Sequence, residues 1–493
     1  MRDEIVFYVN DTRHSVRGGA AGLTLTDYLR YGASPDAQRL CGTKVACAEG
    51  DCGACTVLVG DADPSGEHFS YKTVDACIAF VYQMDRRHVI TVEGLASSAS
   101  LAPTQQAMVD CHGSQCGFCT PGFVMALQGL VEEGSSLSDD DLRLGLSGNL
   151  CRCTGYSQIL DAGHAIEPST ASVASQYDAQ AMLKDFAELT GPVHLNPPSE
   201  QSNGAATKKP PVEVFLPESL DQLIKQKADR PEAKLVAGAT DLGVQHNHGR
   251  FVPTSVITTS RVAELDRLEI VDNELVIGAA VRWSRVEDFV RDRVPEYHHI
   301  LTRFGSPQVR HAGTLVGNLA NASPIADSIP FHYVADSTIE LRSVDGEREV
   351  AINDFYLGYK ELDLHPNEVI TAVRTPLPSA TTRLKLYKIS KRRDMDISTV
   401  TAAFWLELEG DAIASARVAL GGVAATVLRA PEAESALVGK PITEQTLRSA
   451  GQLARDAITP LSDVRGGADY RRQLVENLFV KCFHDLQPEA VTQ

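Results

Sequence analysis

The chain has 493 residues, enough for about three domains. Its 46 Lys and Arg against 64 Asp and Glu give a formal net charge of −18, so it lacks the broad positive field of a non-specific nucleic-acid binder. No uninterrupted apolar run approaches about 18 residues, which excludes a membrane span, and the 22% of charged residues is ordinary for a folded chain.

The first part of the chain is predicted to begin with strands and one short helix and to continue with helices. A strand over 5–9 precedes a short helix over 26–31, and a Cys- and Gly-rich loop over 42–55 leads into a strand over 56–59. From about residue 90 the pattern turns helical, and two of the helices begin at a proline, which suits a first turn. The four predicted helices cover 103–109, 121–130, 139–146 and 158–166.

The second part begins after a segment rich in Ser, Ala, Gln, Asn and Pro, over 167–211, which predicts a linker with one helix over 179–189. Strands over 234–237 and 274–277 and a helix over 284–290 then indicate an α+β domain to about 380. Strands over 402–408 and 416–420, followed by helices, complete the chain. The predicted parts are 1–88, 89–166, the linker 167–211, 212–380 and 381–493.

Ten of the 11 cysteines fall between Cys41 and Cys153, and the last is Cys482. The N-terminus has no apolar core of the signal-peptide kind, so we expect a reducing compartment, the cytoplasm. Clustered thiols in such a compartment bind metal or do redox chemistry more often than they form disulfides.

The first thiol set is Cys47, Cys52 and Cys55, spaced C-x4-C-x2-C, with Cys77 following. This is the spacing of a plant-type 2Fe–2S cluster, and nearby glycines allow the loop to wrap closely around it. A structural zinc site is the alternative, since C-x2-C with a distant cysteine also suits zinc. Cys41 lies outside the pattern and is predicted to be a small buried apolar residue.

The second thiol set is Cys116, Cys119, Cys151 and Cys153, at the ends of predicted helices. Zinc is a stronger rival here, because two cysteine pairs on a small helical unit suit a four-thiolate structural site. If both sets hold iron–sulfur clusters, the chain carries an electron relay, which needs a source and a sink.

Residues 47–55, 112–122 and 148–156 resemble the signatures of the xanthine oxidase family of molybdenum hydroxylases. The resemblance implies a ferredoxin-like β-grasp domain holding one 2Fe–2S cluster and a four-helix-bundle domain holding a second, next to a molybdopterin that Gln115 would face. Ala48 and Asp51 stand where the family often has glycine, but neither is a ligand position.

Two loops of small residues, 235–242 and 313–327, resemble the FAD-binding domain of the same family, which is of the vanillyl-alcohol oxidase type. Alone, each loop is more often an ordinary turn, and the chain has no G-x-G-x-x-G, so a Rossmann site is unsupported. The resemblance implies an FAD diphosphate held by Leu235, Val236, Ala237, Gly238, Ala239, Thr240, Asp241 and Leu242. It implies ribityl and phosphate contacts at Thr314, Gly317, Asn318, Ser323 and Asp327, and further contacts at Phe304, Ile370 and Lys388. By residue type alone, Phe304 and Ile370 would be core residues, and Lys388 would lie on a solvated surface.

The charged run over 388–397 resembles the family's mobile loop near the flavin, which is linked to the choice between NAD and dioxygen as acceptor. A bare charge run is more often a solvated surface. Met395 replaces an acidic residue common in the animal enzymes, so the acceptor preference stays open.

The resemblance covers nearly the whole chain but includes no molybdenum domain, which implies a separate, molybdopterin-binding large subunit and two copies of each chain. The overall expectation is a multidomain α+β protein with a C-terminal α+β flavoprotein domain, passing electrons from purine hydroxylation on the partner to FAD and NAD. No catalytic residue is expected on this chain. The fused domain order favours the xanthine-oxidising branch. Alternatives are an equivalent subunit for aldehydes or other heterocycles, an NADH-linked reductase module and a zinc-stabilised structural protein.

Overall fold

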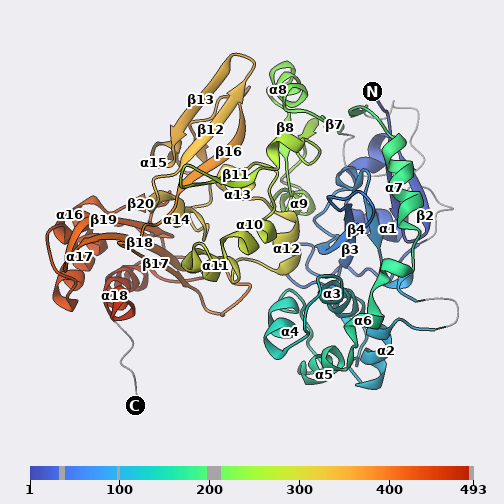
Figure 1. The fold of residues 1–493 in the computed structure, drawn as a ribbon, viewed down its shortest axis with the longest axis horizontal. Coiled ribbons are helices and arrows are strands. Elements are labelled where there is room, and N and C mark those ends of the chain that lie inside the picture. The colour runs from blue at the N-terminus through green and yellow to red at the C-terminus, as the bar shows by residue number, and fades with distance from the viewer. Residues whose placement is uncertain (33–38, 97–99, 197–211, 488–493) are drawn as a thin grey trace. The chain divides into compact units, whose positions relative to one another are not determined.

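The computed structural model describes residues 1–32, 39–96, 100–196 and 212–487. The chain forms two compact units. The first unit comprises Met1–Ala263 with Gly305–Gly313, and the second comprises Glu264–Phe304 with Thr314–Gln493. The boundary falls inside the predicted FAD-binding part, 212–380, so the beginning of that part groups with the cysteine-rich segments. The elements of both units are labelled in Figure 1.

The N-terminal sheet has five strands in the order β2-β1-β5-β3-β4. β1 runs parallel to β5, and the other neighbours are antiparallel, which is the predicted β-grasp arrangement with α1 as its helix. Ile5 and Phe7 of β1 are fully buried in its core. The elements are β1 (Ile5–Val9), β2 (Thr12–Val16), α1 (Leu25–Tyr31), β3 (Thr56–Ala62), β4 (Phe69–Asp75) and β5 (His88–Ile90).

The four predicted helices are observed as α2 (Pro103–Asp110), α3 (Thr120–Glu132), α4 (Asp139–Gly145) and α5 (Ser157–Ala165). Proline occupies the first turn of α2 and α3, where a missing N–H costs nothing, and Ser138 caps α4. The helices pack around a common apolar core that includes Phe123 and Leu142, both fully buried.

The described part of the predicted linker contains α6 (Pro168–Ala171), α7 (Ala179–Glu188) and β6 (Val193–Leu195); its residues 197–211 lie outside the described residues. β6 is the edge of a four-stranded sheet ordered β6-β7-β9-β8. The remaining elements of the first unit are β7 (Glu213–Leu216), α8 (Leu220–Asp229), β8 (Lys234–Val236), α9 (Leu242–Asn247), β9 (Ser255–Thr258) and α12 (Pro307–Ala312).

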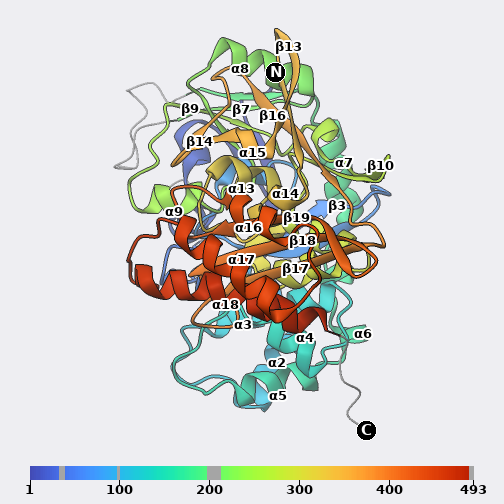
Figure 2. The ribbon, with the colours of Figure 1, turned by 90° about the vertical axis from the view of Figure 1, so that its left-hand side faces the viewer.

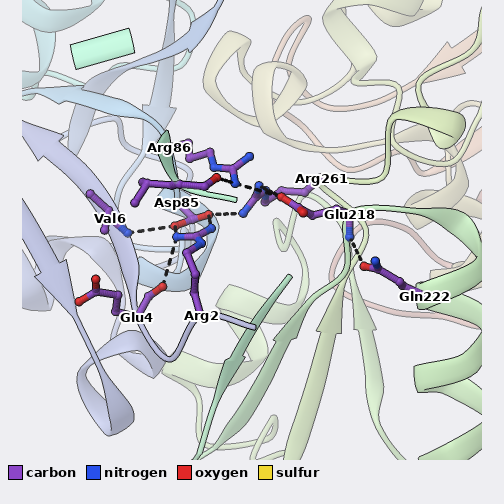
Figure 3. A network of polar contacts seen from close by, with 9 residues as sticks. Arg2, Glu4, Val6, Asp85, Arg86, Glu218, Gln222 and Arg261 are labelled. Carbon is purple, nitrogen blue, oxygen red and sulfur yellow. Dashed lines mark hydrogen bonds and ion pairs between the residues drawn. The ribbon is translucent and has the colours of Figure 1, made fainter. Parts of the chain in front are cut away.

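A buried ionic network joins the two sheets of the first unit (Figure 3). Its centre is Asp85, whose side chain is 1% exposed and accepts hydrogen bonds from Arg2, from Arg261 and from the backbone N–H of Val6. Arg261 also pairs with Glu218. A buried carboxylate is stable only with such partners, so the network fixes the segment after β9 against the β-grasp sheet.

The second unit contains a five-stranded antiparallel sheet in the order β10-β11-β16-β12-β13. Its strands are β10 (Leu268–Val271), β11 (Glu274–Gly278), β12 (Thr338–Ser343), β13 (Gly346–Ala351) and β16 (Val369–Pro376). The accompanying elements are α10 (Trp283–Val290), α11 (Pro295–Leu301), α13 (Leu315–Asn321), α14 (Ile329–Val334), α15 (Ile352–Phe355), β14 (Tyr356–Gly358) and β15 (Glu361–Leu362).

The C-terminal part of this unit is an antiparallel sheet, β17-β18-β19-β20, packed against α16, α17 and α18 (Figure 2). Its elements are β17 (Thr382–Ile389), β18 (Val400–Glu409), β19 (Ala412–Gly421), β20 (Leu428–Arg429), α16 (Pro431–Leu437), α17 (Glu444–Ala457) and α18 (Ala468–Leu486). The predicted multidomain α+β class is therefore confirmed. Across the described residues, no helix combines the length and apolar character that a membrane crossing requires.

Candidate functional site

The first thiol set converges in the loop between α1 and β3. The sulfur of Cys47 accepts the backbone N–H groups of Glu49 and Asp51, each at 3.4 Å. The neighbouring thiols of Cys52 and Cys77, together with these N–H groups, hold the pKa of Cys47 far below its usual range. Cys55 and Cys77 are buried, and the neighbouring Cys77 thiol lowers the pKa of Cys55. The structure thus brings together all four cysteines of the predicted set.

The loop achieves this by left-handed turns at three residues. Gly50, Gly53 and Ala48 have φ angles of 75°, 63° and 58°. Glycine adopts this region without strain, as predicted for the glycines of this loop, whereas Ala48 adopts it at a small cost in free energy. The turns aim backbone N–H groups at the sulfur of Cys47, which suits an anionic centre.

A buried carboxylate lies beside this set and was not identified from the sequence. Asp75, at the end of β4, is 1% exposed, and the thiol of Cys55 donates to its Oδ1 at 3.4 Å. Burial, followed by electrostatic repulsion from Cys55, raises the pKa of Asp75 well above its usual range. The only sequence signal is its place two residues before Cys77.

The second thiol set forms two pairs, and each pair joins a cysteine at the start of α3 to a cysteine in the loop before α5. The sulfurs of Cys116 and Cys153 lie 3.5 Å apart, and Cys119 neighbours Cys151. Burial, followed by the neighbouring Cys151, raises the pKa of Cys119 to about 12. Cys116 and Cys153 are exposed, whereas Cys151 is buried. The four cysteines of the second predicted set are therefore also neighbours.

The arrangement of the thiols fits a two-iron cluster. In the described part of the chain, no group of three or more His, Cys, Asp or Glu is placed to hold a single metal ion. A 2Fe–2S cluster spreads four thiolates over two irons, and the pairwise arrangement in the second set fits this division. Such a cluster would be held by Cys47, Cys52, Cys55 and Cys77 in the first set and by Cys116, Cys119, Cys151 and Cys153 in the second.

The prediction for Cys41 is wrong, because this residue is exposed. Its loop is held by the backbone rather than by the side chain, since the carbonyl oxygen of Cys41 accepts from Lys44 at 2.9 Å and from Arg30 at 3.2 Å. The conformation of this loop therefore does not depend on burial of the Cys41 thiol.

The two thiol-bearing loops are directly hydrogen-bonded to each other. The backbone N–H of Leu150 donates to the carbonyl oxygen of Cys52 at 3.0 Å. The side-chain amide of Asn149 donates to the carbonyl oxygen of Gly53, also at 3.0 Å. Each contact lies within one or two residues of predicted ligands in both sets, so the two sites form one structural block.

The segment 235–242, predicted to hold the FAD diphosphate, covers the end of β8, a tight turn and the first residue of α9. The turn includes Ala239, with a φ of 61°. At the far end of α9, the side-chain amide of Asn247 donates to the carbonyl oxygens of Ala48 at 2.8 Å and of Cys77 at 2.9 Å. Asn247 therefore links the predicted flavin segment to the first thiol loop, a contact that the sequence did not reveal.

In the second unit, the predicted ribityl and phosphate contacts lie on and after α13. The Thr314 hydroxyl caps this helix by accepting from the N–H of Gly317 at 3.0 Å. Asn318 accepts from the hydroxyl of Ser328 at 2.8 Å, while Ser323 and Asp327 lie in the loop between α13 and α14. Several of these side chains thus also hold the loop's own conformation.

The remaining predicted flavin contacts also belong to the second unit. The ring of Phe304 packs against Trp283 with 4.9 Å between centroids, and Ile370 of β16 is 5% exposed. Lys388 is buried, and its Nζ lies 2.6 Å from Oδ2 of Asp327 and donates to the carbonyl oxygen of Arg303 at 3.0 Å. The structure therefore places Lys388 in a buried ion pair rather than on a solvated surface.

The charged run after β17 is held by several hydrogen bonds. Lys391 donates to the carbonyl oxygen of Val464 at 2.8 Å, and the N–H of Arg392 donates to Asp396 at 2.9 Å. The side chain of Arg303 donates to the carbonyl oxygen of Arg393 at 3.1 Å. Met395 has a φ of 61°, a left-handed conformation that is uncommon for this residue type.

Three family models match consecutive segments of the chain. Residues 91–164 match a [2Fe-2S] binding domain, and residues 210–378 match the FAD binding domain in molybdopterin dehydrogenase. Residues 385–486 match the CO dehydrogenase flavoprotein C-terminal domain. An iron–sulfur binding domain and an FAD-binding domain are therefore present.

Curated relatives and solved structures are also similar. The xanthine dehydrogenase 1 of Arabidopsis thaliana is 31% identical over 97% of this chain, and the xanthine dehydrogenase of Emericella nidulans is 31% identical over 98%. The chain spans only 39% of the length of each. Quinoline 2-oxidoreductase from Pseudomonas putida 86 has a TM-score of 0.52 and 29% identity, covering 55% of this chain and 94% of that one. A carbon monoxide dehydrogenase chain from Hydrogenophaga pseudoflava has a TM-score of 0.53 and 28% identity, covering 55% of this chain and 95% of that one.

Proposed function

This chain belongs to the xanthine oxidase family of molybdenum hydroxylases, and we propose that it is the electron-transfer subunit of a xanthine dehydrogenase. In this proposal it accepts electrons from a molybdopterin-binding partner that hydroxylates hypoxanthine and xanthine to urate, and it delivers them to NAD. The proposed assembly contains two copies of each chain. The xanthine dehydrogenases among the relatives support the choice of substrate.

The proposed cofactors are two 2Fe–2S clusters, one on each thiol set, and one FAD. When bound, the clusters carry single electrons and the flavin converts between one- and two-electron steps. The chain's own contribution is to hold these groups close together: Leu150 bonds the second thiol loop to the first, and Asn247 bonds the first to the end of α9. This continuous hydrogen-bonded block within the first unit is the observation that carries the proposal.

The surface around the second thiol set supports a partner on that side. Cys116 and Cys153 are exposed, and so are the nearby apolar side chains Phe118 and Leu150, at 47% and 51%. Exposed apolar side chains beside a redox site are suited to burial in a protein interface. Gln115, which the resemblance places toward the molybdopterin, is also exposed here.

The test is the visible spectrum of the purified chain with its co-purifying partner, recorded without oxygen before and after each substrate is added. The panel contains xanthine, quinoline, an aldehyde and carbon monoxide. We expect xanthine to bleach the flavin and iron–sulfur absorbance, and NAD to restore it. Bleaching by another member of the panel alone would assign a different substrate. Bleaching by NADH alone, with no molybdenum in the preparation, would replace the proposal with a reductase module.

A further inference from the structure

A buried glutamine from a distant part of the chain lies at the junction of the two thiol loops. Gln308 belongs to α12, inside the segment that matches the FAD-binding domain, yet α12 groups with the first unit. Its side chain is 1% exposed. Its amide nitrogen donates to Oδ1 of Asn149 at 2.9 Å and to the hydroxyl of Thr56 at 3.2 Å.

These bonds decide which way the amide of Asn149 points. The oxygen and nitrogen of a side-chain amide have almost the same shape, so only hydrogen bonds distinguish the two orientations. Because Gln308 donates to Oδ1, the nitrogen of Asn149 faces the carbonyl oxygen of Gly53, to which it donates at 3.0 Å. The hydroxyl of Thr56 donates to the same carbonyl at 2.7 Å.

The orientation of Asn149 bears on the next residue of its loop. The N–H of Leu150 donates to the carbonyl oxygen of Cys52 at 3.0 Å, which places the residue before Cys151 directly against a cysteine of the first set. With Asn149 turned the other way, its oxygen would face the Gly53 oxygen and push the two loops apart.

The packing leaves little freedom around Gln308. A Cβ on Gly148 would lie 2.1 Å from Oε1 of Gln308, and a Cβ on Gly53 would lie 2.4 Å from the amide nitrogen of Asn149. Both glycines therefore allow a close approach that any side chain would prevent. The junction is built for contact between three segments that are far apart in the sequence.

We propose that Gln308 is a positioning residue that sets the distance and orientation between the two thiol sets, and thereby the coupling between their clusters. It acts through Asn149 and the Leu150–Cys52 hydrogen bond. The proposal rests on the proposed function, because it assigns a cluster to each set. Buried partners of metal ligands commonly tune a site in this way without touching the metal.

The first test is Gln308→Leu, which keeps a similar volume and removes the donor. Hydrogen exchange of the Leu150 N–H should become about tenfold or more faster, because its hydrogen bond to the carbonyl oxygen of Cys52 is weakened. The magnetic interaction between the two reduced clusters, seen as splitting or broadening in electron paramagnetic resonance, should change while the iron content stays the same. Gly148→Ala adds a methyl group that would push against Oε1 of Gln308, and it should reproduce both effects.

Gln128→Leu is the matched control. Gln128 is a fully buried glutamine on α3 whose bonds go to Thr104, Glu132 and Ala171, none of them in a thiol loop. This variant should leave the magnetic interaction and the Leu150 exchange unchanged.

Unchanged exchange and unchanged magnetic interaction in Gln308→Leu would overturn the proposal. So would a loss of iron in that variant, which would make Gln308 part of cluster retention. If the unmodified chain holds no iron–sulfur clusters, the proposed function fails, whereas the exchange of Leu150 still shows separately whether Gln308 holds the junction.

Discussion

Gly238 has no room for a side chain, because a Cβ on it would lie 2.0 Å from the carbonyl oxygen of Ala312. The turn proposed to hold the FAD diphosphate is thus pressed against the end of α12. Gly238→Ala should force the two backbones apart, with a cost of about 1–3 kcal/mol in the free energy of unfolding, typical of overpacking. It should also reduce the FAD bound per chain, measured by absorbance after gel filtration.

Gly467→Ala is the control for this substitution. The nearest atom to a Cβ on Gly467 is 4.0 Å away, and its backbone, like that of Gly238, has no positive φ. This variant should keep its flavin and lose at most about 1 kcal/mol of stability, because Gly467 is the N-cap of α18, a position that favours glycine over alanine. Full flavin content in Gly238→Ala would show that this turn does not shape the FAD site.

The buried pair of Lys388 and Asp327 gives a second prediction. Their side chains are 1% and 7% exposed, so Lys388→Met leaves an unpaired carboxylate in the interior. The expected cost is about 3–5 kcal/mol, with loss of flavin, and adding Asp327→Asn should restore part of the stability. Chemical denaturation monitored by fluorescence measures both effects.

Lys385→Met provides the comparison, because Lys385 pairs with Glu296 and these side chains are 24% and 31% exposed. A partly exposed pair contributes about 0–1 kcal/mol. If the two lysine variants lose the same stability, burial does not set the importance of the Lys388 pair.

The third prediction separates the two thiol sets. Cys116→Ser should remove one cluster and roughly halve the iron content, because a serine hydroxyl is a poor replacement for a thiolate ligand. Electron flow from purine to NAD should stop, whereas reduction of the flavin by NADH should persist. Cys41→Ser, at an exposed cysteine outside both sets, should keep the full iron content. Loss of flavin reduction in Cys116→Ser would contradict the proposed order of the relay.

The fourth prediction concerns pH. His332 is fully buried between Tyr297, Ser337 and Thr375, and burial lowers its pKa to about 3. The unfolded chain binds a proton at this histidine below about pH 6.5, and the folded chain does not. Folding stability should therefore fall as the pH drops from about 6.5 toward 3, by up to about 1.4 kcal/mol per pH unit from this group.

His332→Gln should remove this part of the pH dependence. Both tryptophans of the chain, Trp283 and Trp405, lie in the second unit, so their fluorescence follows the unfolding of the unit that contains His332. An equally steep fall of stability in the variant would assign the effect to other groups.

Local pattern was enough to predict much of this molecule. The helix over 103–109 is observed as α2, and the strand over 56–59 begins β3, because proline placement and apolar runs act within a few residues. The two cysteine spacings likewise predicted thiols that the fold brings together, although neighbours such as Cys116 and Cys153 are far apart in sequence.

Contacts between distant segments could not be predicted. No local sequence pattern near Gln308 indicates that α12 belongs to the cysteine-rich unit. Likewise, no local pattern around Asn247 indicates its hydrogen bond to the carbonyl oxygen of Cys77. Residue type also misled where a partner decides the outcome. Lys388 is buried because Asp327 neutralises it, and Cys41 is exposed because its loop is held by its carbonyl oxygen.

The cofactor content is tested by measuring iron, acid-labile sulfide, zinc and flavin per chain, with electron paramagnetic resonance after reduction by dithionite. We expect two 2Fe–2S clusters and one FAD per chain, and two distinct signals from the reduced clusters. A colourless protein with zinc in place of iron, or a single cluster signal with half the expected iron, would contradict this expectation.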